Sequence, residues 1–105
     1  MTHAAPQRLE LSRAPDGTIV LRGEIDMTTA PALRAALVGG PDGSGGALRI
    51  DLREVTYLDS AGLSLLYDHA RNLHLIAAPN TAVATVLEIG GLVAAATVEL
   101  LPPGS

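Results

Sequence analysis

The sequence predicts an α/β domain with helices packed on a single mixed β-sheet. Segments with strand-like apolar patterns alternate with segments of helical periodicity, which is typical of parallel strands joined by right-handed crossovers. The first two strands are separated only by the turn Pro15-Asp16-Gly17, so they form a hairpin and make the sheet mixed. The chain has 105 residues, the size of one domain. We expect a flexible leader over residues 1–8, the domain over 9–101 and a tail over 102–105.

The N-terminal hairpin is indicated by the order of its side chains. Leu9–Ser12 alternates apolar and polar residues, which is the pattern of a half-buried strand. Strand character resumes at Thr18–Leu21, and Gly23–Asp26 closes the second strand.

The first helix is bounded by a capping signal and a glycine pair. Thr28 and Thr29 are good capping residues, and Pro31 suits a first helical turn, where its missing N–H costs nothing. Gly39-Gly40 ends this helix. The glycine-rich stretch 39–46 is predicted to be a flexible connector. It lacks the Lys and the Ser or Thr of a phosphate-binding loop, and it leads into a strand.

The middle of the chain predicts a strand, a short loop and a second helix. Ala47–Leu52 is an apolar run that becomes polar at its end, so we place Asp51 at the end of the third strand. A short loop leads to Tyr57–Gly62, after which the apolar residues of 63–70 recur at helical spacing.

The last third of the chain predicts two strands around a short helix. His74–Ala77 has strand character, residues 83–87 have helical spacing, and Gly90-Gly91 ends that helix. The apolar segment Val93–Leu100 is expected to form the final strand.

Composition excludes several classes of function. Seven Lys and Arg against eleven Asp and Glu give a net charge of −4, which disfavours binding to nucleic acid or to an acidic membrane surface. The chain has no Cys, and its three His lack metal-ligand spacing, so we expect no metal and no cofactor. Phe and Trp are absent, so the core is predicted to consist of Leu, Val, Ile and Ala. Neither a signal peptide nor a membrane-length apolar run is evident, which predicts a cytoplasmic protein.

The segment Leu58–Leu63, Leu-Asp-Ser-Ala-Gly-Leu, carries the densest functional signal. It follows a strand and opens a helix, so we expect the Ser60 hydroxyl to be exposed beside free N–H groups and the positive end of the helix, where a phosphate is favoured. Gly62 would leave room for another protein's active site. A second interpretation stays open on the residues alone, in which Asp59 or Ser60 simply caps the helix.

Enzymatic alternatives use the same residues. A hydrolase elbow needs Gly two positions before the serine, but Leu58 stands there. Asp26, with Glu24 nearby, ends the second strand, and Asp26 and Asp59 are expected to flank Ser60 at the carboxyl edge of the sheet. Such a pair would bind magnesium or act as acid and base. The competing interpretation is that both are solvated carboxylates at strand ends.

Several motifs in order give the sequence a family resemblance over residues 9–100. The chain resembles a STAS domain of the bacterial anti-sigma factor antagonist type, the SpoIIAA and RsbV group. The resemblance is carried by Gly23-Glu24-Ile25-Asp26, Thr29-Ala30-Pro31-Ala32-Leu33, Ile50-Asp51-Leu52, Tyr57-Leu58-Asp59-Ser60-Ala61-Gly62-Leu63 and Gly90-Gly91-Leu92.

The resemblance implies a binding module that is switched by phosphorylation and has no catalytic activity. In the family, an anti-sigma factor kinase phosphorylates the serine that follows the aspartate, and Ser60 holds that position. The unphosphorylated antagonist binds the anti-sigma factor and frees a sigma factor, and a serine phosphatase restores it. The implied partner-binding residues are Asp26, Asp59, Ser60, Ala61 and Gly62.

The sequence departs from the family pattern in two places. Arg71–His74 joins helix to strand without the glycine-bearing extension of relatives, and the usual C-terminal helix after Leu100 is missing, with Pro102–Ser105 in its place. We therefore expect an apolar surface that needs cover by a partner or by a second copy in a homodimer.

Two other functions remain to be weighed. STAS subunits that dock on an ABC-transporter ATPase in lipid transport resemble the same fold and keep a hydroxyl residue near this turn. Asp59-Ser60 together with Gly23–Asp26 favours the antagonist. A small enzyme using Asp26 and Asp59 is disfavoured because the aromatic residues and motifs that build a substrate pocket are missing.

Overall fold

The computed structural model describes residues 8–39 and 48–104. The expected connector at 40–47, most of the expected leader and the last residue of the tail lie outside the described residues. In chain order the elements are β1 (Leu9–Arg13), β2 (Ile19–Ile25), α1 (Ala30–Gly39), β3 (Leu48–Leu58), α2 (Ser60–Asp68), the 3-10 turn η1 (Ala70–Asn72), β4 (Leu73–Ala77), α3 (Ala82–Ile89), α4 (Leu92–Ala95) and β5 (Thr97–Leu100).

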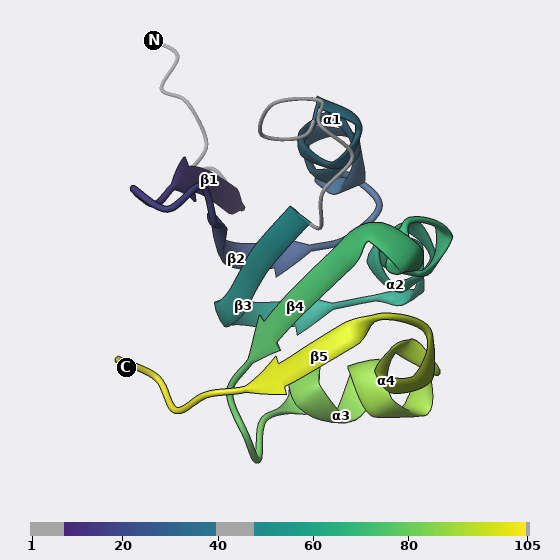
Figure 1. The fold of residues 1–105 in the computed structure, drawn as a ribbon. Helices are drawn as coiled ribbons and strands as arrows, with labels where there is room; N and C mark the ends of the chain where they lie inside the picture. Colours follow the sequence, from purple (N-terminus) through teal and green to yellow (C-terminus); the bar gives the residue numbers. More distant parts are fainter. Residues whose placement is uncertain (1–7, 40–47, 105) are drawn as a thin grey trace, which may run out of the picture.

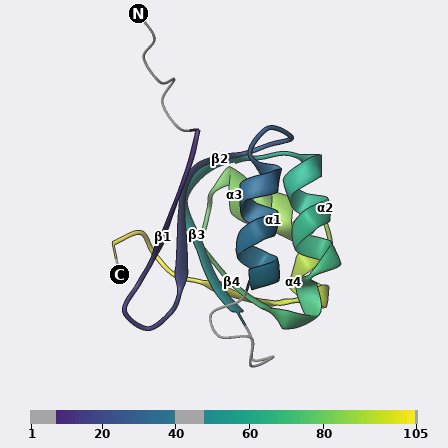
Figure 2. The same cartoon turned by 90° about the horizontal axis from the view of Figure 1, so that it is seen from above.

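The five strands form one mixed sheet in the order β1-β2-β3-β4-β5. β1 pairs antiparallel with β2, and every later pair is parallel, which confirms the predicted fold class. Each crossover moves the chain one strand further in the same direction. Because right-handed crossovers in one direction all pass over the same face, the helices lie together on one side of the sheet (Figures 1 and 2).

The core lies between this face and the helices and is aliphatic, as expected. Its largest fully buried side chains come from the strands β2, β3 and β4 and from the helices α1 to α4: Ile19, Leu21, Ile25, Leu33, Ile50, Leu52, Leu66, Leu75, Leu87 and Leu92.

The helix-free face of the sheet is polar. Alternation along β2 and β3 turns Arg22 and Arg49 away from the core. Arg22 pairs with Glu54 at 3.0 Å and with Glu10 at 3.5 Å, and Arg49 lies 3.9 Å from Glu99. The charged side chains of this face are therefore held in ion pairs. Residues 101–104 contain no helix.

The third strand is longer than predicted. We expected it to end at Leu52, with Asp51 at its end and a loop up to Tyr57, but β3 runs to Leu58. Pairing with β2 continues along the added residues because register shifts absorb the irregularity. Val55 and Leu58 stay buried, whereas Thr56 and Tyr57 between them are exposed, so the segment lacks the apolar run of a fully buried strand.

The predicted strand Val93–Leu100 is wrong in its first half. The structure places α4 there and begins β5 at Thr97. Gly91 has φ 82°, a left-handed conformation that lets the chain turn directly from α3 into α4. Leu92, the first residue of α4, is fully buried. A short apolar run fits a buried strand and a buried helix equally well, so its pattern did not separate the two.

Candidate functional site

The start of α2 is built by Asp59, not by Ser60. Asp59 follows β3 in an extended conformation, and its Oδ1 accepts hydrogen bonds from Ala61 N at 2.9 Å and from Gly62 N at 3.1 Å. Its own amide donates to the carbonyl of Ile25 at 3.1 Å, which fixes the helix start against the end of β2. Ser60 is the first residue of α2 and is exposed, as the sequence predicted. We expected free N–H groups beside Ser60, but the amides of Ala61 and Gly62 both donate to the Asp59 side chain.

Gly62 has a packing role that the sequence did not reveal. It is buried in the first turn of α2, and a Cβ atom there would overlap the side chains of Ile25 and Leu58. Its lack of a side chain therefore lets the helix approach the ends of β2 and β3. The space that Gly62 leaves open faces the core and not a visiting protein.

Asp26 lies between the end of β2 and the start of α1. Its Oδ1 accepts hydrogen bonds from the Thr28 amide at 2.9 Å, the Thr28 hydroxyl at 2.7 Å and the Thr29 amide at 3.1 Å. The Thr28 hydroxyl is the main cause that lowers the pKa of Asp26 below its ordinary value of 3.8. The carboxylate is therefore ionised at neutral pH and held in one orientation.

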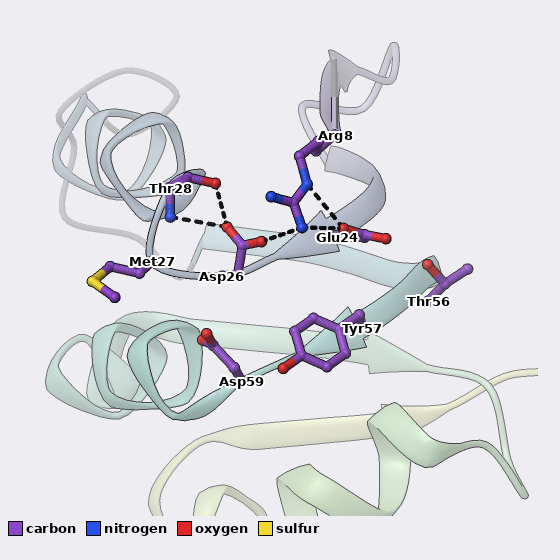
Figure 3. Close-up of a pocket in the computed structure, with 8 residues that line it drawn as sticks. All are labelled: Arg8, Glu24, Asp26, Met27, Thr28, Thr56, Tyr57 and Asp59. Atoms are coloured by element: carbon purple, nitrogen blue, oxygen red, sulfur yellow. Dashed lines mark hydrogen bonds and ion pairs between the residues drawn. The ribbon is translucent and has the colours of Figure 1, made fainter. Parts of the chain in front are cut away.

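Arg8, which the sequence placed in the leader, reaches both carboxylates of this region. Its Nη2 lies 2.8 Å from Asp26 Oδ2 and 2.7 Å from Glu24 Oε1. Figure 3 shows Arg8 and Thr28 approaching the Asp26 carboxylate from opposite sides. The hairpin pairing sets this contact, because Leu9 pairs with Gly23 and the Glu24 amide donates to the Arg8 carbonyl at 2.6 Å.

These residues line an open cleft of about 660 Å³ that extends to Asp59, the residue before Ser60. Its floor and walls bring together the ends of β2 and β3 and the start of α1 (Figure 3). The lining includes three carboxylates and one guanidinium, and two large apolar side chains are exposed there, Met27 at 76% and Tyr57 at 51%. The lining residues are Arg8, Glu24, Asp26, Met27, Thr28, Thr56, Tyr57 and Asp59.

The structure brings the two predicted site carboxylates together. Asp26 and Asp59 both line the cleft, but each is already engaged, one as a turn former and the other as a helix cap. Asp51, which the sequence placed only at the end of the third strand, lies outside the cleft within β3, where it pairs with Arg53. Among the described residues no group of three His, Asp or Glu side chains is placed to hold a metal ion.

Sequence reasoning missed Arg8, Met27 and Tyr57 as site residues. Arg8 precedes the first strand, and its partners lie 16 residues or more away. Two signals were available: the hairpin register places Arg8 opposite Glu24, and Met27 directly follows Asp26 while Tyr57 lies two positions before Asp59.

The comparisons with known proteins agree on one type of domain. Residues 9–102 match a family model described as "Mlab, STAS domain". The chain is 44% identical over 55 residues to the anti-sigma-B factor antagonists of Listeria monocytogenes and Listeria innocua. The aligned segment covers 52% of this chain and 48% of each relative. The match thus spans about half the length of these curated relatives.

A solved structure resembles the whole fold. The crystal structure of an anti-sigma factor antagonist from Mycobacterium paratuberculosis superposes with a TM-score of 0.69 at 26% identity, covering 92% of this chain and 90% of that one. In the part of this chain that the structure describes, no helix has the length and apolar character needed to cross a membrane.

Proposed function

The chain belongs to the STAS domain family, and we propose that it is an anti-sigma factor antagonist that binds an anti-sigma factor kinase while Ser60 is unphosphorylated. Binding would free a sigma factor for transcription. Phosphorylation of Ser60 by the kinase would end binding, and a serine phosphatase would restore it. The protein itself would be a cytoplasmic binding module without catalysis.

One observation supports this proposal most strongly. Ser60 is exposed at the first position of α2, while the neighbouring Asp59 performs the capping. The hydroxyl is therefore not needed for the helix and is accessible to a kinase. The cleft that Asp59 lines offers charged and apolar side chains together, a combination found in protein interfaces. We assign Asp26, Asp59, Ser60 and Ala61 to the partner-binding surface, with Gly62 shaping the turn beneath them.

The local electrostatics provide a reason for the switch. A phosphate on Ser60 adds about −1.5 to −2 charges and three acceptor oxygens. Asp59 Oδ1 already accepts from Ala61 N and Gly62 N, so the phosphate would stand beside a carboxylate and remain hydrated. A partner packed around Ser60 would have to accommodate and desolvate this group, which is costly. Affinity should therefore fall although the fold is unchanged.

The test of this proposal is to measure how strongly the wild-type protein and its serine variants bind the anti-sigma factor kinase from the same organism. We expect Ser60→Ala to bind but to resist phosphorylation with ATP, and Ser60→Asp to bind weakly. Ser64 is an exposed serine one turn further along α2, so Ser64→Ala and Ser64→Asp are matched controls that should bind and become phosphorylated normally.

Two outcomes would contradict the proposal. Equal binding of Ser60→Asp and Ser64→Asp would remove the switch. Recovery of an ABC-transporter ATPase in place of an anti-sigma factor, in a co-purification from the native cell, would favour the transport alternative that the sequence left open.

A further inference from the structure

We infer that Arg8 is a built-in competitor at the partner-binding cleft, where its guanidinium occupies the carboxylates that a basic group of the partner would use. The inference rests on the proposed function, because it concerns the same surface. It adds a residue that lies outside the family motifs and that sets how strongly the cleft attracts a cation.

The two oxygens of Asp26 have different roles. Oδ1 is held by the donors of Thr28 and Thr29, so the carboxylate is oriented without help from Arg8. Oδ2 is the oxygen that Arg8 contacts, and the side chain as a whole is only 12% exposed. Arg8 is therefore an occupant of the outward-facing oxygen and not the support that positions it.

Arg8 is placed there by the backbone of the hairpin. Gly23 has φ 116°, and a Cβ atom at that position would overlap the Arg8 carbonyl. Only glycine allows the chain before β1 to lie this close to β2. The Arg8 carbonyl then accepts the Glu24 amide, which brings the guanidinium within reach of Glu24 and Asp26.

The contact is suited to exchange. The Arg8 side chain is 54% exposed and that of Glu24 is 41% exposed, and ion pairs between exposed side chains are weak because water and salt screen them. A partner cation can therefore displace Arg8 from Glu24 at small cost, and at the mostly buried Asp26 it would take over the contact that Arg8 gives up. While Arg8 is in place it reduces the negative charge of a cleft that otherwise presents only carboxylates as charged groups, namely Glu24, Asp26 and Asp59.

The side chains that line the cleft indicate what kind of partner segment would bind there. Exposed Met27 and Tyr57 flank the carboxylates, so the fitting segment is basic with an apolar neighbour. Removing Arg8 should strengthen binding of such a segment at low salt, and the gain should shrink as salt rises.

The test is a titration of triarginine peptide into the full chain at low salt, followed by the amide NMR shifts of Thr28, Thr29 and Ala61. Arg8→Gln should bind about two- to fivefold more tightly than the wild type, the factor that corresponds to one exposed ion pair. Arg13→Gln is the matched control, because it removes the same charge at the other end of β1 and should show no gain.

The outcomes separate this inference from the proposed function. Equal affinities of Arg8→Gln and Arg13→Gln, or no saturable binding to any form, would overturn it. So would a gain that persists when Asp26→Asn is added to Arg8→Gln. If the gain appears but unphosphorylated protein fails to bind the anti-sigma factor kinase, the competitor role of Arg8 stands and the proposed function fails.

Discussion

Asp51 and Arg53, two positions apart on β3, form a paired contact on the helix-free face of the sheet. Arg53 Nη2 lies 2.8 Å from Asp51 Oδ2, and Arg53 Nε lies 3.0 Å from Oδ1. The two side chains are only 12% and 15% exposed. Arg53 Nη1 also donates to the carbonyl of Pro102 at 2.9 Å, so this pair ties the segment after β5 to the centre of the sheet.

We expect Asp51→Asn to destabilise the protein by about 1–3 kcal/mol, because the mostly buried guanidinium of Arg53 loses its charged acceptor. Urea unfolding followed by circular dichroism measures the change. Glu54→Gln, also on β3, is the control: it breaks the exposed pair with Arg22 of β2 and should cost clearly less than Asp51→Asn, because exposed ion pairs contribute little to stability. Equal losses in the two variants would contradict the special role of the Asp51 pair.

The same pair predicts a dependence of stability on acid. Burial raises the pKa of Asp51, but the hydrogen bonds and charge of Arg53 outweigh it and leave the pKa below its ordinary value of 3.8. A carboxyl whose pKa is lowered by folding contributes stability that is fully present above the unfolded-state pKa. That stability is lost as the pH falls through the lower folded-state pKa. Wild type and Asp51→Asn should therefore differ most well above the ordinary carboxyl pKa of 3.8 and converge as the pH falls below it. A difference that stays constant over this range would exclude ionisation as its cause.

Gly62→Ala should destabilise the domain by about 1–3 kcal/mol, the usual cost of forcing a methyl group into a packed core. The added Cβ would push α2 away from Ile25 and Leu58. Amide shifts should change at the ends of β2 and β3, and partner binding should weaken because the helix start moves. Ser64→Ala, an exposed change on the same helix, should leave both stability and binding intact. Unchanged stability in Gly62→Ala would show that the close approach is not required.

Phosphorylation of Ser60 should leave the backbone nearly unchanged. The helix start is already fixed by Asp59 and by its bond to the carbonyl of Ile25, so the phosphate needs no rearrangement to be accommodated. Amide shifts of the two forms should differ around Ser60 and Asp26 only. Changes that extend to β1 or β5 would indicate a conformational switch and contradict a local electrostatic and steric effect.

The sequence by itself determined the features that depend on neighbouring residues. Alternation and the turn at Pro15-Asp16-Gly17 predicted the hairpin, and the order of strands and helices predicted the mixed sheet. The segment Leu58–Leu63 predicted an exposed Ser60 at a helix start. Each of these signals extends over a few residues, and backbone geometry and capping act at the same range.

Only the tertiary structure decided the features that depend on distant parts of the chain. β3 extends to Leu58 because β2 continues to pair with it. Leu92 begins a helix because its side chain is then fully buried in the core. Gly62 is needed for a contact with Ile25, and Arg8 reaches the site through the pairing of β1 with β2. Burial and ion pairing depend on which surfaces pack together in the folded chain. A local pattern of apolar and charged residues is compatible with several such packing arrangements.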